Sequence, residues 1–179
     1  MNWYEFVKSF AVRFDEPKRI LDPTLTIAGI EFVKIANNPN GAIMVANKIV
    51  FNSKFGENDD FANSIILRRL REEVLPRIEA DIGAENVREF EVNLKTTTNP
   101  NKYLNIKSKI SIPSEQTFNR CRDFFNRHNI PYNWWFCTAY GDGDLWICDS
   151  SGSTHCYERP YRTFGVRPII CINPELLNT

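Results

Sequence analysis

The strongest constraint on the fold is the last quarter of the chain, where short apolar segments are separated by turn residues every few positions. Residues 134–139 and 145–148 have the length and composition of single strands. Residues 154–158 follow the Ser-Ser-Gly-Ser sequence at 150–153, which predicts a hairpin because glycine and serine favour tight turns. Residues 165–172 are the last predicted strand. A segment of this kind favours small antiparallel sheets joined by irregular loops.

Alternating apolar residues predict more strands upstream. Residues 25–36 and 42–51 should pair as a hairpin, because the segment 37–41 between them contains asparagine, proline and glycine. Residues 87–94 and 104–112 alternate in the same way and are predicted strands.

Two segments have the spacing of amphipathic helices. The first is expected to be capped by Asn58-Asp59-Asp60 and to kink or end at Pro76, which has no amide hydrogen. The second opens at Ser114 and ends at residues 129–131. A shorter helix that runs into a strand is predicted over residues 2–14. The predicted inner faces are Ile66, Leu67, Leu70, Val74 and Leu75 in the first helix, and Phe118, Cys121 and Phe125 in the second.

The composition fits one globular domain of the α+β class. The chain has 179 residues, of which 42% are hydrophobic and 25% are charged. A chain of this size can bury a core without disulfides or metals. No linker or repeat divides it, so we expect a single domain over residues 1–179. Within that domain, residues 1–24 are a helix and strand lead-in and residues 25–172 are the core.

Charge and hydropathy argue against nucleic-acid and membrane partners. The 22 basic and 22 acidic side chains give no net charge, whereas nucleic-acid binders usually have a basic excess. The densest basic cluster, residues 68–71, is followed directly by two glutamates and indicates a solvated helix face. No apolar run approaches the ~20 residues of a membrane span, and the first ten residues lack the apolar core of a signal peptide. We expect a cytoplasmic or virion-associated protein.

Cysteine usage favours free thiols over disulfides or zinc ligands. None of the spacings is Cys-x-x-Cys, and only two histidines occur. An odd number of cysteines without an export signal indicates reduced, partly buried thiols. The five cysteines are Cys121, Cys137, Cys148, Cys156 and Cys171.

The C-terminal segment also matches a family pattern. It begins with Trp134-Trp135, passes through a polar hairpin, and ends with Gly165-Val166-Arg167-Pro168 before an apolar strand. This resembles an uncharacterised family of bacterial and phage domains whose C-termini contain Trp-Trp-Leu-Arg-Ser-Pro and later Gly-Val-Arg-Pro. The resemblance covers roughly residues 25–172. Phe136-Cys137-Thr138-Ala139 stands where the family has Leu-Arg-Ser-Pro, so any role of that arginine is not carried over.

The resemblance implies a C-type-lectin-like fold. The family is related in architecture to formylglycine-generating proteins and to the variable proteins of diversity-generating retroelements. The fold that it implies has short antiparallel strands, two main helices and an irregular, loop-rich C-terminal half. It implies a scaffold that displays variable side chains from loops and a hairpin, and no established activity.

The function we expect is a non-catalytic binding module for a protein or a carbohydrate. Exposed aromatic residues among polar ones suit such partners, because they combine stacking area with adaptable hydrogen bonds. The candidate partner-binding residues are Tyr140, Asp142, Asp144, Trp146, Tyr157, Tyr161 and Arg162. The residues assigned to the scaffold are Trp134, Trp135, Gly165, Arg167 and Pro168. A buried arginine needs carboxylate or carbonyl partners, and the candidate carboxylates for Arg167 are Asp142, Asp144, Asp149 and Glu158.

Two other functions stay open. A phage or mobile-element accessory protein that masks a host protein inside the cell fits the small size and reduced cysteines. An enzyme on the same scaffold would use Cys148 with His155, which face each other if residues 151–152 form a two-residue turn. Alternatively, it would use a metal in the acidic loop at residues 142–149. No cofactor is expected, with calcium left open only by that loop, because the known phosphate, zinc and calcium motifs are absent.

Overall fold

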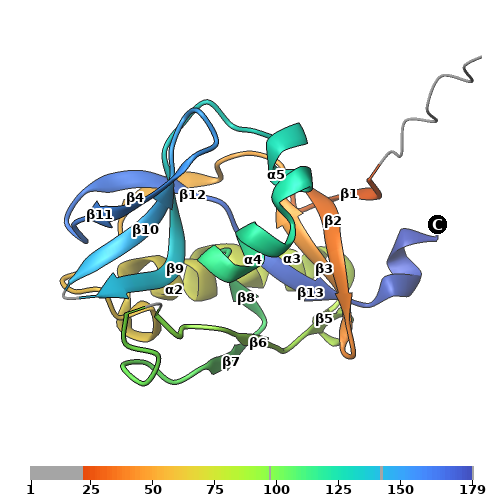
Figure 1. The fold of residues 1–179 in the computed structure, drawn as a ribbon. Helices are drawn as coiled ribbons and strands as arrows, with labels where there is room; N and C mark the ends of the chain where they lie inside the picture. The colour runs from red at the N-terminus through yellow and green to blue at the C-terminus, as the bar shows by residue number, and fades with distance from the viewer. Residues whose placement is uncertain (1–21, 97, 142, 179) are drawn as a thin grey trace, which may run out of the picture.

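The computed structural model describes residues 22–96, 98–141 and 143–178, which form two β-sheets, a two-stranded ribbon and several helices (Figure 1). The mixed α+β class is therefore confirmed. The helix and strand predicted over residues 2–14 lie outside the described residues. No helix within those ranges is both long and apolar enough to cross a membrane.

The first sheet has the strand order β1-β2-β3-β13-β5, and β8 also pairs with β13. Its strands are β1 (Thr24–Ile27), β2 (Ile30–Asn38), β3 (Gly41–Ala46), β5 (Val87–Arg88), β8 (Ile110–Ser111) and β13 (Ile169–Ile172). The predicted hairpin is confirmed as β2–β3, where Asn38 Oδ1 accepts the Gly41 amide at 2.9 Å. The strand predicted over 25–36 is instead two strands, because Ala28 and Gly29 form a tight turn with φ of 51° and 76°.

The second sheet has the strand order β11-β10-β9-β12-β4. Its strands are β4 (Phe51–Lys54), β9 (Trp134–Gly141), β10 (Asp144–Cys148), β11 (Thr154–Glu158) and β12 (Thr163–Val166). Only β9 and β12 run parallel. The three short strands predicted between residues 134 and 158 are thus confirmed. A separate ribbon joins β6 (Phe90–Val92) to β7 (Ile106–Ser108).

Four predicted strands are broken where the chain leaves one sheet for another. The segment 42–51 divides into β3 and β4, and the segment 165–172 divides into β12 and β13. The segment 87–94 divides into β5 and β6, and the segment 104–112 into β7 and β8. Apolar residues occur on both sides of each break, because both sides contribute to one common core.

Two of these crossovers are hydrogen-bonded to each other. The Ala46 amide donates to the Pro168 carbonyl oxygen at 2.8 Å, and the Val50 amide donates to the Val166 carbonyl oxygen at 2.9 Å. The β3–β4 crossover and the β12–β13 crossover therefore form one seam between the two sheets.

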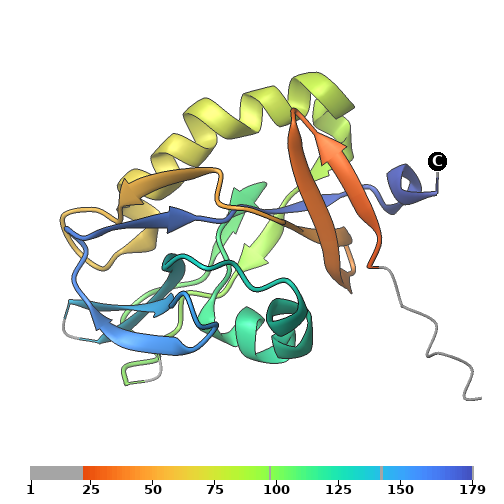
Figure 2. The same cartoon turned by 90° about the horizontal axis from the view of Figure 1, so that it is seen from above.

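One long helix covers the sheets on one side, and two short helices lie on the other (Figure 2). The long helix consists of α2 (Ile65–Arg69), the π-helical turn η2 (Leu70–Val74) and α3 (Leu75–Ile82). The predicted cap is wrong. Asp60 caps the short 3₁₀ turn η1 (Phe61–Asn63), whereas Ser64 Oγ accepts the Leu67 amide at 3.0 Å and caps α2.

The sequence predicts that the helix kinks or ends at Pro76, and the structure shows that it does not end there. The Leu75 amide donates to the Leu70 carbonyl, five residues back. A turn of this width lets the chain pass a residue that has no amide hydrogen. The helix continues to Gly83, which ends it with φ of 88°. The predicted inner face is confirmed at Ile66, Leu67, Leu70 and Val74, all 3% exposed or less, and Leu75 is partly buried.

The second predicted helix is two short helices, so the fold has one main helix and not two. They are α4 (Glu115–Arg120) and α5 (Arg122–Arg127), and Ser114 caps the first as expected. Cys121 separates them with φ of −111° and ψ of 26°, outside the helical range. Short 3₁₀ turns η3 (Ala84–Asn86) and η4 (Pro174–Leu177) complete the fold.

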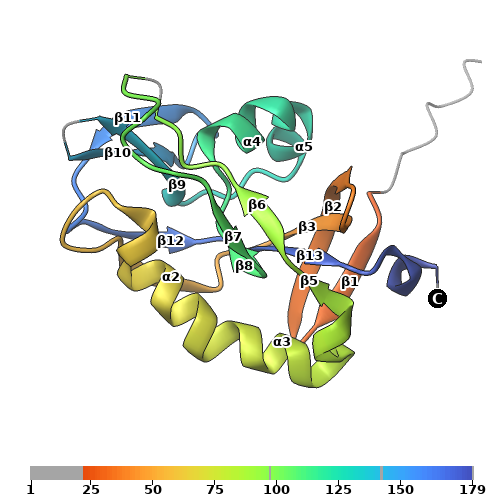
Figure 3. The same ribbon diagram turned by 90° about the horizontal axis from the view of Figure 1, so that it is seen from below.

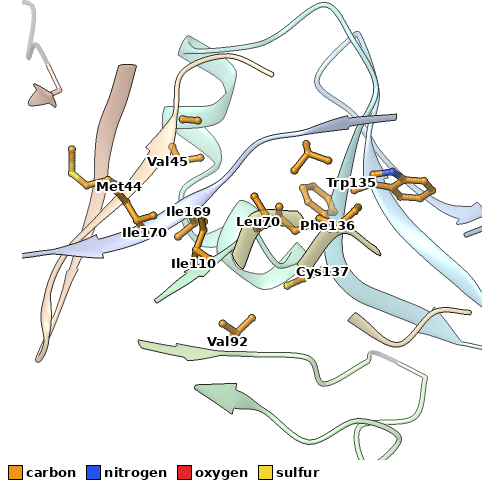
Figure 4. Close-up of a cluster of buried hydrophobic side chains, with 14 of the residues drawn as sticks. Met44, Val45, Leu70, Val92, Ile110, Trp135, Phe136, Cys137, Ile169 and Ile170 are labelled. Atoms are coloured by element: carbon orange, nitrogen blue, oxygen red, sulfur yellow. The ribbon is translucent and has the colours of Figure 1, made fainter. Parts of the chain in front are cut away.

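The core is continuous between the two sheets, and β9 lies at its centre. Figure 4 shows Leu70, Phe136 and Ile169 within one cluster of buried side chains. Trp134 packs toward α4 and α5, with its ring centroid 6.0 Å from that of Phe118. Trp135 points to the other face, 5.6 Å from Phe55, and donates its indole hydrogen to Ser53 O at 2.9 Å.

The cap on the long helix gives a direct test of this fold. Ser64 is 4% exposed, and replacing it with alanine leaves helix amides without an acceptor. We expect Ser64→Ala to lower the free energy of unfolding by about 1 kcal/mol, measured by urea unfolding followed by circular dichroism. The control Ser150→Ala changes an exposed serine and should stay within about 0.5 kcal/mol. Equal stability of the two variants would contradict the assignment of the cap.

Candidate functional site

Of the candidate partner-binding residues, Tyr140, Asp144 and Trp146 lie on the adjacent strands β9 and β10, whereas Tyr161 and Arg162 lie on the loop between β11 and β12. Tyr140 near the end of β9 and Trp146 in the middle of β10 are both partly exposed. Their rings meet edge to face, with centroids 5.4 Å apart and planes at 83°. We call these two residues the aromatic pair. The Trp146 Nε1 atom is buried and has no hydrogen-bond partner among the described residues.

β11 carries a β-bulge opposite Trp146. The register between β10 and β11 shifts there, so that two residues of β11, Cys156 and Tyr157, lie opposite the single residue Trp146 of β10. A bulge bends its strand and increases the local twist, and bulges are common beside binding sites. The side chain of Tyr157 and the whole of Asp142 lie outside the described part of the chain, so only the backbone position of Tyr157 is placed beside Trp146.

Charged side chains lie on the same strands and on the loop after β11. Arg159 Nε is 3.1 Å from Asp144 Oδ1, and Arg162 Nε is 3.9 Å from Glu158 Oε2. The two arginine side chains are 52% and 65% exposed, so these ion pairs stabilise the fold little and can exchange for contacts with a partner. Tyr161 is 64% exposed on the loop between them.

The loop between β6 and β7 is fixed against this end of the sheet. Thr98 Oγ1 donates a hydrogen bond to the Tyr140 carbonyl oxygen. The Asp59 carboxylate accepts Lys102 Nζ at 2.6 Å and Tyr103 Oη at 2.7 Å. Burial raises the pKa of Asp59, but these two bonds outweigh it and leave the pKa below its usual value. Sequence reasoning missed these contacts because they join positions 42 to 44 residues apart.

The predicted pairing of Cys148 with His155 is wrong by one residue. The register places Cys148 opposite Thr154, because the turn is longer than two residues and closes with the Asp149 amide on the Ser153 carbonyl at 2.8 Å. Cys148 is 1% exposed. Burial, together with the charge of Asp149, raises the pKa of its thiol to about 12. Such a thiol is not a nucleophile at neutral pH, and His155 does not face it.

Asp149 organises the hairpin turn instead. Its Oδ1 accepts the Ser151 hydroxyl at 2.7 Å and the amides of Ser151 and Ser153 at 2.8 and 2.9 Å. Its Oδ2 lies 2.8 Å from His155 Nε2. The Ser151 hydroxyl has the largest effect, and together these donors lower the pKa of Asp149 to about 2. From the sequence, Asp149 is only a candidate partner of Arg167 and a member of an acidic loop.

Arg167 is buried without a carboxylate partner among the described residues. Its side chain is 0% exposed, and its Nε donates to the Ala46 carbonyl oxygen at 2.7 Å. The guanidinium carbon lies 5.9, 5.1 and 5.4 Å from the ring centroids of Phe124, Phe125 and Trp134. The prediction of a carboxylate partner is therefore wrong for Asp144, Asp149 and Glu158. The alternative prediction, a carbonyl partner, is confirmed at Ala46. Asp144 and Glu158 contact Arg159 and Arg162, and Asp149 contacts His155.

The other residues assigned to the scaffold lie along the seam and in the core. Trp134 and Trp135 are 1% and 0% exposed. The Gly165 amide donates to the Asn133 carbonyl oxygen at 2.9 Å, and a Cβ added at Gly165 would overlap the Ile49 side chain. Pro168 contributes one of the two carbonyls that join the crossovers.

The described residues contain neither a disulfide bond nor a group of side chains arranged as metal ligands. The five cysteines form no disulfide. In the ranges that the structure covers, no three histidine, cysteine or acidic side chains gather as metal ligands would. Because Asp142 is outside those ranges, the calcium alternative stays a prediction that the structure does not test.

Comparison with known proteins identifies no relative. No protein-family model matches the chain, no curated protein matches it, and no solved structure matches its fold.

The Asp149 turn predicts a pH dependence of stability. The carboxyl has its pKa lowered from 3.8 to about 2 in the folded chain, so its contribution is present above pH 3.8 and is lost as the pH falls toward 2. Because the group is close to solvent, we expect about 1 kcal/mol. Urea unfolding of the wild type and Asp149→Asn should differ at pH 7 and converge near pH 2. A difference that stays constant with pH would contradict this role.

Proposed function

We propose that this chain is a non-catalytic binding module on a C-type-lectin-like scaffold, with a protein or a glycan as its partner. The proposed contact surface consists of the aromatic pair, the ion-paired residues Asp144 and Arg159, and the exposed Tyr161 and Arg162. The observation that carries the proposal is the aromatic pair, which holds a partly exposed indole on β10, the strand next to the edge strand β11.

The surrounding structure supports a recognition surface that is ordered before binding. The Thr98 bond to the Tyr140 carbonyl and the anchoring of Lys102 and Tyr103 on Asp59 hold the neighbouring loop in place. Order of this kind reduces the conformational entropy lost on association. Aromatic residues supply stacking area to sugars and to apolar side chains, and the arginines supply charged donors.

The scaffold part of the proposal has its own support. Apart from the two short helices α4 and α5, the C-terminal half consists mainly of short strands, loops and a hairpin. The Gly165 to Pro168 sequence lies where the chain passes from one sheet to the other. A rigid crossover of this kind allows the hairpin beyond it to vary without disturbing the core. A catalytic use of Cys148 has no comparable support, because its thiol is buried and His155 is turned to Asp149.

The test is binding by matched aromatic variants. We expect Trp146→Ala to weaken binding on a broad glycan array or protein array by about 10- to 100-fold, the usual effect of removing a central aromatic contact. Tyr161→Ala, at an exposed loop position, should weaken binding less while leaving the thermal unfolding unchanged.

The control is Tyr132→Ala. Tyr132 is 65% exposed and precedes β9, at the opposite end of that strand from Tyr140, so its loss should leave binding intact. Equal binding by the wild type and Trp146→Ala, or an equal loss in the Tyr132 variant, would contradict the proposed surface. Signal on glycans alone or on proteins alone identifies the class of partner.

A further inference from the structure

Two adjoining hollows lie on a different part of the molecule, between the β2–β3 hairpin and the α4–α5 helices. The first has a volume of about 400 Å³ and the second about 270 Å³. Their walls share Ile35, Arg120 and Cys121. Figure 3 shows α4 and α5 on the same side of the molecule as β6, with β2 nearby.

Two local irregularities open this region. Lys34 pairs with Met44 and Ala36 pairs with Ile43, so Ile35 is an extra residue in β2 and forms a β-bulge. Across from it, Cys121 interrupts the helix that the sequence predicts, and its Sγ donates to the Ile35 carbonyl oxygen at 3.7 Å. A bulge facing a helix break leaves space that a regular strand against a regular helix would fill.

The first hollow has an apolar floor. Apolar side chains from four strands and from the approach to α4 line it, namely Ile35, Ile43, Phe90, Val92, Ile112 and Ile169. Amide side chains form part of its rim, where Asn93 Nδ2 donates to Gln116 Oε1 at 2.5 Å. Its walls also carry other polar side chains, among them Asn38, Glu91 and Thr117. Its volume and its mixture of apolar and polar groups fit a small-molecule site. We call it the apolar hollow.

The second hollow is basic. Its wall contains four cations, Lys34, Arg120, Arg122 and Arg127, and two carboxylates, Asp22 and Asp123. Asp22 is already bound by Arg127 at 2.9 Å and His128 at 3.2 Å. The side chains of Lys34 and Arg120 make no hydrogen bond or ion pair with any other described residue. We call it the basic hollow.

We propose that the two hollows form one binding site for a small anionic amphiphile. The apolar body lies in the apolar hollow, and the carboxylate or phosphate head lies in the basic hollow, against Lys34 and Arg120. Burial of the body supplies affinity in proportion to its apolar area, and the arginine supplies paired donors that match the geometry of both head groups. The site is separate from the aromatic pair, so it stands or fails independently of the proposed function.

Cys121 provides the readout, because it lies where the two hollows meet. Burial raises the pKa of its thiol, which the charge of Arg120 partly offsets, so alkylation by iodoacetamide is measured at mildly alkaline pH. The internal control is Cys156, which is also partly buried but lies on β11 in the other sheet. Peptide mass spectrometry separates the two alkylation rates in one sample of the full chain.

The probes are octanoate, octyl phosphate and octanol. We expect one or both anions to slow alkylation of Cys121 by at least about fivefold while Cys156 is unaffected, and octanol to protect less. Protection by octanoate alone assigns a carboxylate head, and protection by octyl phosphate alone assigns a phosphate head. No protection, equal slowing at Cys121 and Cys156, or equal protection by octanol would overturn the proposal.

Variants of the basic hollow complete the test. Arg120→Gln and Lys34→Gln should each raise the anion concentration needed for half-maximal protection about tenfold. Each variant is compared with its own rate in the absence of ligand, since the charge at position 120 also affects the thiol. The control Arg71→Gln removes an exposed arginine on η2, outside both hollows, and should behave as the wild type. Unchanged protection in the Arg120 variant would also overturn the assignment of the head group.

Discussion

The fold depends on the burial of Arg167 at the seam between the two sheets. The side chain is fully buried, its Nε is bonded to the Ala46 carbonyl, and three aromatic rings surround the guanidinium. Burial lowers its pKa to about 10, so the group still carries its charge at neutral pH. A buried charge without a carboxylate is costly. The ring faces and the carbonyl offset that cost because each presents negative potential to the cation.

These contacts join elements that are far apart in the sequence. Arg167 reaches β3 through Ala46, α5 through Phe124 and Phe125, and β9 through Trp134. Both candidate surfaces depend on elements held in this way. The far end of β9 carries Tyr140 of the aromatic pair, and α5 with the residues before it forms one side of the basic hollow. The seam thus fixes the positions of two surfaces that do not contact each other.

Local sequence signals predicted most of the strands, the β2–β3 hairpin and the Ser114 cap, because turn residues and alternation act over a few positions. The crossovers were not predictable from the sequence. Apolar residues occur on both sides of each crossover and do not indicate which sheet each strand joins. The hairpin register was missed because Asp149 closes a longer turn through its side chain. The candidate aromatic surface was named from composition, whereas the two hollows depend on irregularities at Ile35 and Cys121 that no pattern indicated.

The most direct test of the central role of Arg167 is the stability of Arg167→Lys. Lysine keeps the charge but cannot place a planar guanidinium among the rings or donate from the Nε position. Urea unfolding at pH 7 should show a loss of at least about 2 kcal/mol, whereas the exposed control Arg71→Lys should stay within about 0.5 kcal/mol of the wild type. Equal stability of Arg167→Lys and the wild type would contradict the account of the seam.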